Sequence, residues 1–133
     1  MGIHNIQFPK IDASHLDQDE AFFYLITEGE KEKILLHDYG RIYDISGLYE
    51  QLFYERLKCC SPEKVVEVLK QTIELNNDYF STMRVLDFGA GNGMIGEELK
   101  RIGVARLVGA DILEEAKTAT LRDRPGIYDE YSS

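Results

Sequence analysis

The 133-residue sequence has no tryptophan, three prolines, three histidines and only two cysteines, Cys59 and Cys60. Adjacent cysteines rarely reach the geometry of a disulfide with each other, and no third cysteine offers a partner. The thiols are therefore expected to stay reduced, as in a cytoplasmic protein. His4, His15 and His37 have no metal-ligand spacing with one another or with the cysteines, so no metal site is expected.

Long apolar runs and an excess of positive charge are also missing. No apolar run approaches the roughly 20 residues that span a bilayer, and Met1 to Lys10 lack the basic start and apolar stretch of a signal peptide. No membrane association is therefore expected. The formal net charge is −9, which argues against nucleic acid or an anionic membrane as a partner because both are polyanions.

The chain otherwise has the composition of a globular protein, with 44% hydrophobic and 29% charged residues in the length of one domain. We expect the polar segment through Glu20 to be an irregular arm, and its acidic run, residues 17–20, to be a solvated turn rather than a cation site. Two apolar runs, residues 21–27 and 31–37, flank Glu28-Gly29-Glu30 and predict a β-hairpin. A helix is the competing interpretation of this segment.

Helical spacing then predicts two helices. The first runs from about Gly47 to Lys58, with a buried face of Leu48, Leu52, Phe53 and Leu57. The second begins with Ser61 as its N-cap and Pro62 in its first turn, and it ends at Asn76-Asn77-Asp78. Its predicted buried stripe is Val65, Val66, Leu69 and Ile73.

A strand, a glycine turn, a helix and a second strand follow. Residues 83–88 predict a short buried strand, and Gly89, Gly91 and Gly93 come directly after it. The helix face is Ile95, Leu99 and Ile102, and Gly103 ends it. Residues 105–110 predict the second strand, which ends at Asp111, and a last helix runs from about Leu113 to Arg122. This order is typical of the front of a dinucleotide-type fold.

Each part of this pattern suits ligand binding. Glycines allow a sharp turn at positive φ and let a ligand approach the main chain. The free N–H groups of the following helix favour an anionic or carboxylate-bearing ligand. Asp111, at the tip of the second strand, can accept hydrogen bonds from both hydroxyls of a ribose.

Two glycine registers compete for this turn. Gly91-x-Gly93-x-x-Gly96 has the spacing of a nicotinamide-dinucleotide motif, with Asp111 about 20 residues further on. The other register is Asp87-x-Gly89-x-Gly91-x-Gly93. A dinucleotide strand usually runs apolar into its first glycine, whereas Asp87 intervenes here and suits a cofactor with an ammonium group. The second register is therefore favoured.

The segment Val85-Leu86-Asp87-Phe88-Gly89-Ala90-Gly91-Asn92-Gly93 resembles motif I of class I S-adenosylmethionine-dependent methyltransferases, and residues 107–112 resemble their following acidic motif. The resemblance implies an α/β fold with an incomplete, front-half Rossmann-like parallel sheet over residues 61–133, preceded by an arm, a β-hairpin and a lid helix over residues 1–60. It also implies a cofactor site for S-adenosyl-L-methionine made of Asp87, Gly89, Ala90, Gly91, Asn92, Gly93, Asp111 and Ile112.

Within that site, the resemblance implies that the turn holds the methionine part of the cofactor and that Asp87 lies near its amino group, directly or through water. Asp111 would hold the ribose, and Ile112 would pack on the adenine. The stretch from Tyr39 to Glu50 resembles the tyrosine-rich lid of some of these enzymes, although core packing is favoured for its tyrosines.

The expected activity is methyl transfer to a small-molecule or protein acceptor. The acceptor-binding and catalytic residues of this superfamily usually follow the fourth strand, so no catalytic residue is nominated. The functional unit is expected to include more polypeptide or to be a homodimer, since the first strand would otherwise have an exposed edge. A non-catalytic methyltransferase-like binding protein and an NAD-dependent oxidoreductase remain as alternatives.

Overall fold

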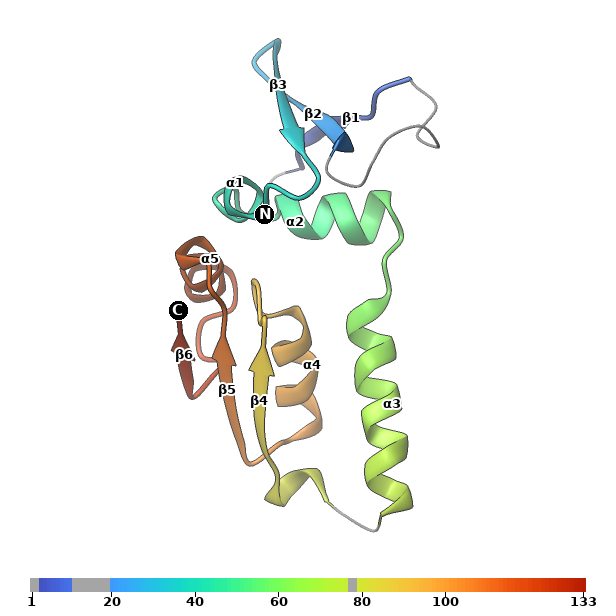
Figure 1. Ribbon diagram of the computed structural model, residues 1–133, viewed down its shortest axis with the longest axis vertical. Coiled ribbons are helices and arrows are strands. Elements are labelled where there is room, and N and C mark those ends of the chain that lie inside the picture. Colours follow the sequence, from blue (N-terminus) through green and yellow to red (C-terminus); the bar gives the residue numbers. More distant parts are fainter. Residues whose placement is uncertain (1–2, 11–19, 77–78) are drawn as a thin grey trace. The chain divides into compact units, whose positions relative to one another are not determined.

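The computed structural model describes residues 3–10, 20–76 and 79–133 (Figure 1). The chain divides into two compact units, Met1–Lys58 and Cys59–Ser133. The sequence placed this boundary two residues later, between residues 60 and 61. Most of the acidic run, residues 17–19, and the end of the second predicted helix, residues 77–78, lie outside the described residues.

The first unit contains a three-stranded antiparallel sheet in the order β1-β2-β3. The predicted hairpin is confirmed, with β2 at Phe22–Thr27 paired to β3 at Glu30–Leu35. Glu28 and Gly29 make the turn with φ values of 51° and 83°. Positive φ at both central residues suits the right-handed twist of the paired strands, which explains why glycine follows Glu28.

The expectation of an irregular arm before Glu20 is wrong for its first part. Asn5–Gln7 forms β1, which pairs antiparallel with β2 and buries Ile6. Helix side chains also bind this short strand: Gln51 Oε1 accepts from the His4 N–H at 2.8 Å, and Arg56 donates to the Ile6 carbonyl at 3.0 Å. Three residues are too few for an alternating pattern to be recognised in the sequence.

Three short helical segments follow the hairpin: α1 at Tyr39–Tyr43, α2 at Leu48–Glu50 and a π-helical turn, η3, at Gln51–Arg56. The predicted helix is confirmed, but Leu57 lies beyond its end and is exposed, because the wide turn closes with Leu57 N–H bonded to the Leu52 carbonyl. Tyr43 is buried against Tyr49, with ring centroids 5.2 Å apart. The buried core of this unit is Ile6, Phe23, Leu25, Ile34, Ile42, Leu48 and Leu52.

The second unit is built on a three-stranded parallel sheet in the order β4-β5-β6 (Figure 1). Its strands are β4 at Arg84–Phe88, β5 at Arg106–Ala110 and β6 at Glu130–Ser132. Its helices are α3 at Ser61–Leu75, the 3₁₀ turn η4 at Phe80–Thr82, α4 at Met94–Ile102 and α5 at Glu114–Asp123. The whole chain is thus a mixed α/β protein with one antiparallel and one parallel sheet.

One stripe of α3 packs on α4 and the sheet. Val66, Leu69 and Ile73 lie on it, as predicted, and Val66 packs with Leu99 and Leu107. Val65 does not: it is 49% exposed, because it lies on the next face of the helix, with Val68. Ser61 is the first helical residue rather than the N-cap, which is Cys60.

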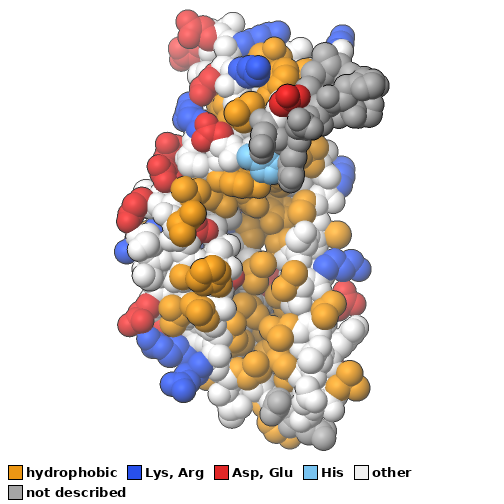
Figure 2. All heavy atoms as spheres, viewed as in Figure 1, with side chains coloured by type: hydrophobic (Ala, Val, Ile, Leu, Met, Phe, Trp, Pro, Cys, Tyr) orange, Lys and Arg blue, Asp and Glu red, His pale blue; other side chains and the backbone are white. Residues whose placement is uncertain are grey.

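The prediction that β4 is buried is wrong for one of its faces. Leu86 is 61% and Phe88 is 84% exposed, whereas Asp87 between them is buried. Alternate side chains of a strand point to opposite faces, and only the Val85 and Asp87 face is covered by described residues. Figure 2 shows hydrophobic side chains gathered on the visible surface over the strands of this unit.

Among the described residues, no helix combines the length and the apolar character needed to cross a membrane.

Candidate functional site

A hollow of about 350 Å³ lies at the carboxyl ends of the parallel strands. The register Phe88↔Ala110↔Ser132 brings the three strand ends to one edge of the sheet, which is where open α/β sheets bind ligands. The predicted site residues Gly89, Asp111 and Ile112 line it, together with Phe88, Ala110, Ser132 and Ser133. The other predicted residues, which do not line the hollow, are Asp87, Ala90, Gly91, Asn92 and Gly93, and all are buried.

The glycine turn contains all three glycines that follow Asp87, each at positive φ. Gly89, Gly91 and Gly93 have φ values of 74°, 57° and 90°. The N–H groups of Gly89 and Ala90 both donate to the Ala110 carbonyl, at 2.8 and 2.9 Å, so the turn is attached to the end of β5. Residues with a Cβ rarely adopt these φ values, and the three glycines are therefore required by the turn itself.

Asp111 bonds to the turn and to the start of α5. Its Oδ2 accepts from the Gly91 N–H at 2.9 Å, and its Oδ1 accepts from the Leu113 N–H at 3.0 Å. Leu113 is the N-cap residue of α5, so a structural, helix-capping role for Asp111 is present. Each carboxylate oxygen has a second lone pair, which leaves capacity for ribose hydroxyls as well.

Asp87 lies on the inner side of β4, below the turn. The Tyr128 hydroxyl donates to Asp87 Oδ2 at 2.7 Å. Burial raises the pKa of Asp87, the Tyr128 hydrogen bond lowers it, and the charge of Asp111 raises it again. The net effect is an upward shift, because desolvation is the largest contribution.

Three side chains that were not predicted from the sequence donate hydrogen bonds to main-chain carbonyls of the turn. The hydroxyls of Thr120 and Tyr131 donate to the Gly91 carbonyl at 2.9 and 2.7 Å, and Arg124 donates to the Asn92 carbonyl at 3.2 Å. Together with Asp111, these contacts bind the Gly91 residue at both its N–H and its carbonyl. Thr120 lies within the predicted last helix, but its position in the sequence does not identify its hydrogen-bond partner.

Tyr128 is another residue that was not predicted from the sequence, and its ring packs closely on two glycines. A Cβ added at Gly96 of α4 would lie 2.4 Å from Tyr128 Cζ, and one added at Gly109 of β5 would lie 3.0 Å from Tyr128 Cδ1. The first distance is shorter than real Cβ contacts, and the second is tighter than most of them. Gly96 therefore makes room for an aromatic ring and lies within a helix rather than in the turn.

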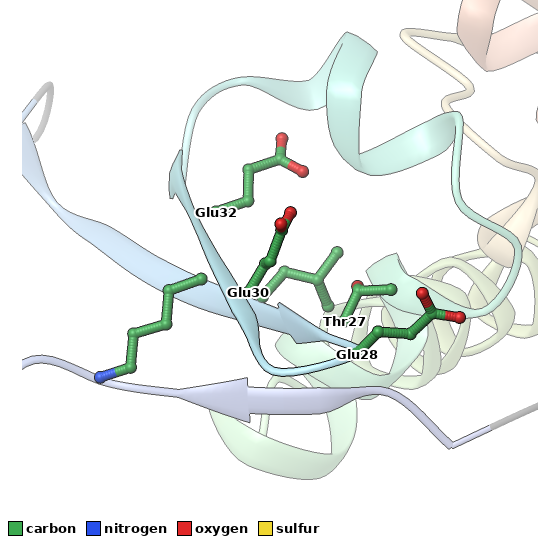
Figure 3. Close-up of a pocket in the computed structure, with 6 residues that line it drawn as sticks. Thr27, Glu28, Glu30 and Glu32 are labelled. Carbon is green, nitrogen blue, oxygen red and sulfur yellow. The ribbon is translucent and has the colours of Figure 1, made fainter.

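A second hollow, of about 270 Å³, lies beside the β2–β3 hairpin of the first unit (Figure 3). Thr27, Glu28, Glu30 and Glu32 line it, with Leu25 and Lys31. Glu32 is paired with Arg41 through two hydrogen bonds of 2.8 Å, and that hydrogen bonding lowers the pKa of Glu32. Exposed hairpin carboxylates, one of them paired, do not make this hollow a candidate site.

No group of three or more His, Cys, Asp or Glu side chains that could hold a metal ion occurs in the part of the chain that the structure describes. Comparisons with protein-family models, with curated proteins and with solved structures find no match to this chain.

Proposed function

We propose that the second unit is the front half of a Rossmann-like methyltransferase domain that binds S-adenosyl-L-methionine in the hollow at the strand ends. The methyl acceptor would be a small molecule or a protein. One observation carries the proposal: carboxylates lie on both sides of the glycine turn, Asp87 beneath it and Asp111 bonded to the Gly91 N–H. The parallel order β4-β5-β6, with a glycine turn after β4 and an acid after β5, supports it.

The charge of these groups favours a cationic ligand. Asp87 and Asp111 are close enough for the charge of one to raise the pKa of the other. An ammonium or sulfonium group would relieve that repulsion, whereas the pyrophosphate of NAD would add to it. A dinucleotide also needs free main-chain N–H groups at the turn, and Asp111 already accepts from that of Gly91.

The shape of the hollow suits a nucleoside. Phe88, Ala110 and Ile112 give it apolar walls, and Asp111 supplies a hydrogen-bond acceptor at its edge. Ile112 is 93% exposed, so its side chain is available to pack on a flat base. A nucleoside with its ribose at Asp111 and its base on Ile112 satisfies both features.

The bound cofactor would supply an electrophilic methyl group on a sulfonium. The residues of this chain would bind and orient it, since the transfer depends mainly on aligning the acceptor with the methyl group. Among the described residues, Asp111 is the one titratable side chain that lines the hollow, and we assign it to binding rather than to proton transfer.

Calorimetric titration with S-adenosylhomocysteine and with NAD, side by side, tests the proposal. Both ligands carry adenosine, but they differ in the charge of the group that would lie at the turn. We therefore expect heat of binding from S-adenosylhomocysteine and not from NAD. Binding of NAD alone would overturn the proposal. Transfer of a labelled methyl group by the full-length gene product would then separate an enzyme from a binding protein.

Asp111→Ala should lower the affinity for S-adenosylhomocysteine about 10- to 100-fold, because roughly 1.5–3 kcal/mol of charge-assisted hydrogen bonding to the ribose is lost. Asp129→Ala is the matched control. Asp129 Oδ2 also accepts a main-chain N–H, that of Leu107 at 2.7 Å, near the opposite end of β5. Both variants should lose stability, and only Asp111→Ala should lose affinity. Equal affinity losses would show that Asp111 acts through the fold alone.

A further inference from the structure

We propose that Tyr128 is a positioning residue of the cofactor site, whose hydroxyl fixes the orientation and the charge of the Asp87 carboxylate beneath the glycine turn. The inference rests on the proposed function, since it requires a ligand with a cationic amino-acid group. It assigns a role to a side chain that does not line the hollow and lies 41 residues from Asp87 along the chain.

The ring of Tyr128 is closely packed. Cβ atoms added at Gly96 and Gly109 would lie 2.8 and 3.0 Å from its Cε1 atom, so both glycines lie close against the ring. The Tyr131 ring meets it edge-on, with centroids 5.3 Å apart. The hydroxyl donates to Asp87 Oδ2, 2.7 Å away.

The hydrogen bond fixes one oxygen of Asp87. A carboxylate held by one strong donor keeps its second oxygen in a defined direction. The turn above it is held equally firmly, because the Gly91 carbonyl accepts from Thr120 and Tyr131. A ligand amino group would thus meet an acceptor whose position is set before binding, which lowers the entropic cost of binding.

Charged and titratable groups reach this region from several elements. Burial raises the pKa of Asp87, and the charge of Asp111 at the end of β5 raises it further. Tyr131 lies beside Tyr128, and its own pKa is raised first by burial and then by the charges of Asp111 and Asp87. Arg124, at the end of α5, is paired with Glu97 and bonded to the Asn92 carbonyl. Tyr128 opposes the upward shift at Asp87, because its hydrogen bond stabilises the ionised form.

The pH dependence of binding follows from these shifts. An ammonium group is held by ionised Asp87, so affinity is full above the pKa of Asp87 and falls as the pH drops through it. Affinity plotted against pH therefore falls at low pH. Removal of the Tyr128 hydroxyl raises the pKa of Asp87. In Tyr128→Phe the falling part of the curve, the acid limb, should therefore move to higher pH.

The experiment is titration of the folded chain with S-adenosylhomocysteine at a series of pH values from about 4 to 7.5, which starts near the ordinary pKa of an aspartate and extends upward because the pKa of Asp87 is raised. In Tyr128→Phe we expect the acid limb to move up by about one pH unit, which is about tenfold in affinity on the limb. The affinity at the top of the range should change little. Tyr131→Phe, which removes the hydroxyl bonded to the Gly91 carbonyl, should leave the limb in place.

Two further measurements separate this role from a structural one. 5′-Methylthioadenosine lacks the amino-acid part, so its affinity should be insensitive to Tyr128→Phe. Asp87→Asn should weaken S-adenosylhomocysteine binding and remove the acid limb, and this variant serves where Tyr128→Phe does not fold. The inference is overturned if the acid limb is retained in Asp87→Asn, if it does not move in Tyr128→Phe, or if it moves equally in Tyr131→Phe. Absence of S-adenosylhomocysteine binding to the unaltered chain at every pH would instead overturn the proposed function.

Discussion

Gly89→Asn should lower the affinity for S-adenosylhomocysteine by at least about 100-fold, or about 2.7 kcal/mol, while the chain remains folded. Gly89 lines the hollow at the strand ends, and an added Cβ would meet no atom within 4 Å. A side chain there would extend into the space that the cofactor needs. Asparagine is chosen because it tolerates positive φ better than other residues, and Gly89 has φ of 74°. Calorimetric titration measures the loss.

Gly29→Asn is the matched control for this variant. Gly29 also has positive φ, 83°, and open space around an added Cβ, but it lies in the hairpin turn of the first unit. The two variants should lose similar stability, and only Gly89→Asn should lose binding. Normal affinity in a folded Gly89→Asn protein would mean that the hollow is not the cofactor site.

Gly96→Val should destabilise the second unit by about 3 kcal/mol, the upper end of the range for overpacking a well-filled core. The new Cβ would lie 2.4 Å from the ring of Tyr128, which is also closely packed against Gly109. Hydrogen exchange at the β5 amides reports this loss within the unit itself. The variant should also bind S-adenosylhomocysteine more weakly, because displacement of Tyr128 frees Asp87.

A double-mutant cycle with Tyr128→Ala tests the cause. Each single change should be strongly destabilising, since truncation of a large aromatic costs about 3–5 kcal/mol. The double variant should be less destabilised than the sum, by at least about 1 kcal/mol, because the valine fills part of the space that the ring leaves. Additive losses would show that Gly96 is needed for a reason other than the ring.

The local part of the candidate site was predictable from the sequence. Asp87 and the three glycines occupy alternate positions of one short segment, and the positive φ values of the glycines depend on residue type. The hairpin and the helix from Met94 to Ile102 were equally accessible, because turn chemistry and helical spacing are local signals. The ligand itself stays a prediction.

The supports of the site were not predictable, because they depend on contacts far apart in the chain. Tyr128 meets Asp87 across 41 residues, and Tyr131 meets Gly91 across 40. Nothing in the spacing of these two tyrosines, one just before β6 and one in its middle, identifies those partners. Their side chains reach the turn only because β6 pairs with β5 and brings them beside Gly109.

The exposed face of β4 has a different cause. An apolar run indicates a strand, but it does not say how many of its faces are covered by other elements. Leu86 and Phe88 lie on the face that no described residue covers.

Of the two hydroxyls that meet at the Gly91 carbonyl, that of Thr120 links the turn to α5 and that of Tyr131 links it to β6, an outer strand of the parallel sheet. Tyr131 is the middle residue of β6, which is only three residues long. Short outer strands open readily, and an opened β6 would release the turn. Ligand binding in the hollow and pairing of β6 with β5 would therefore be thermodynamically linked. A higher ligand concentration would lower the fraction of molecules in which β6 is locally unfolded.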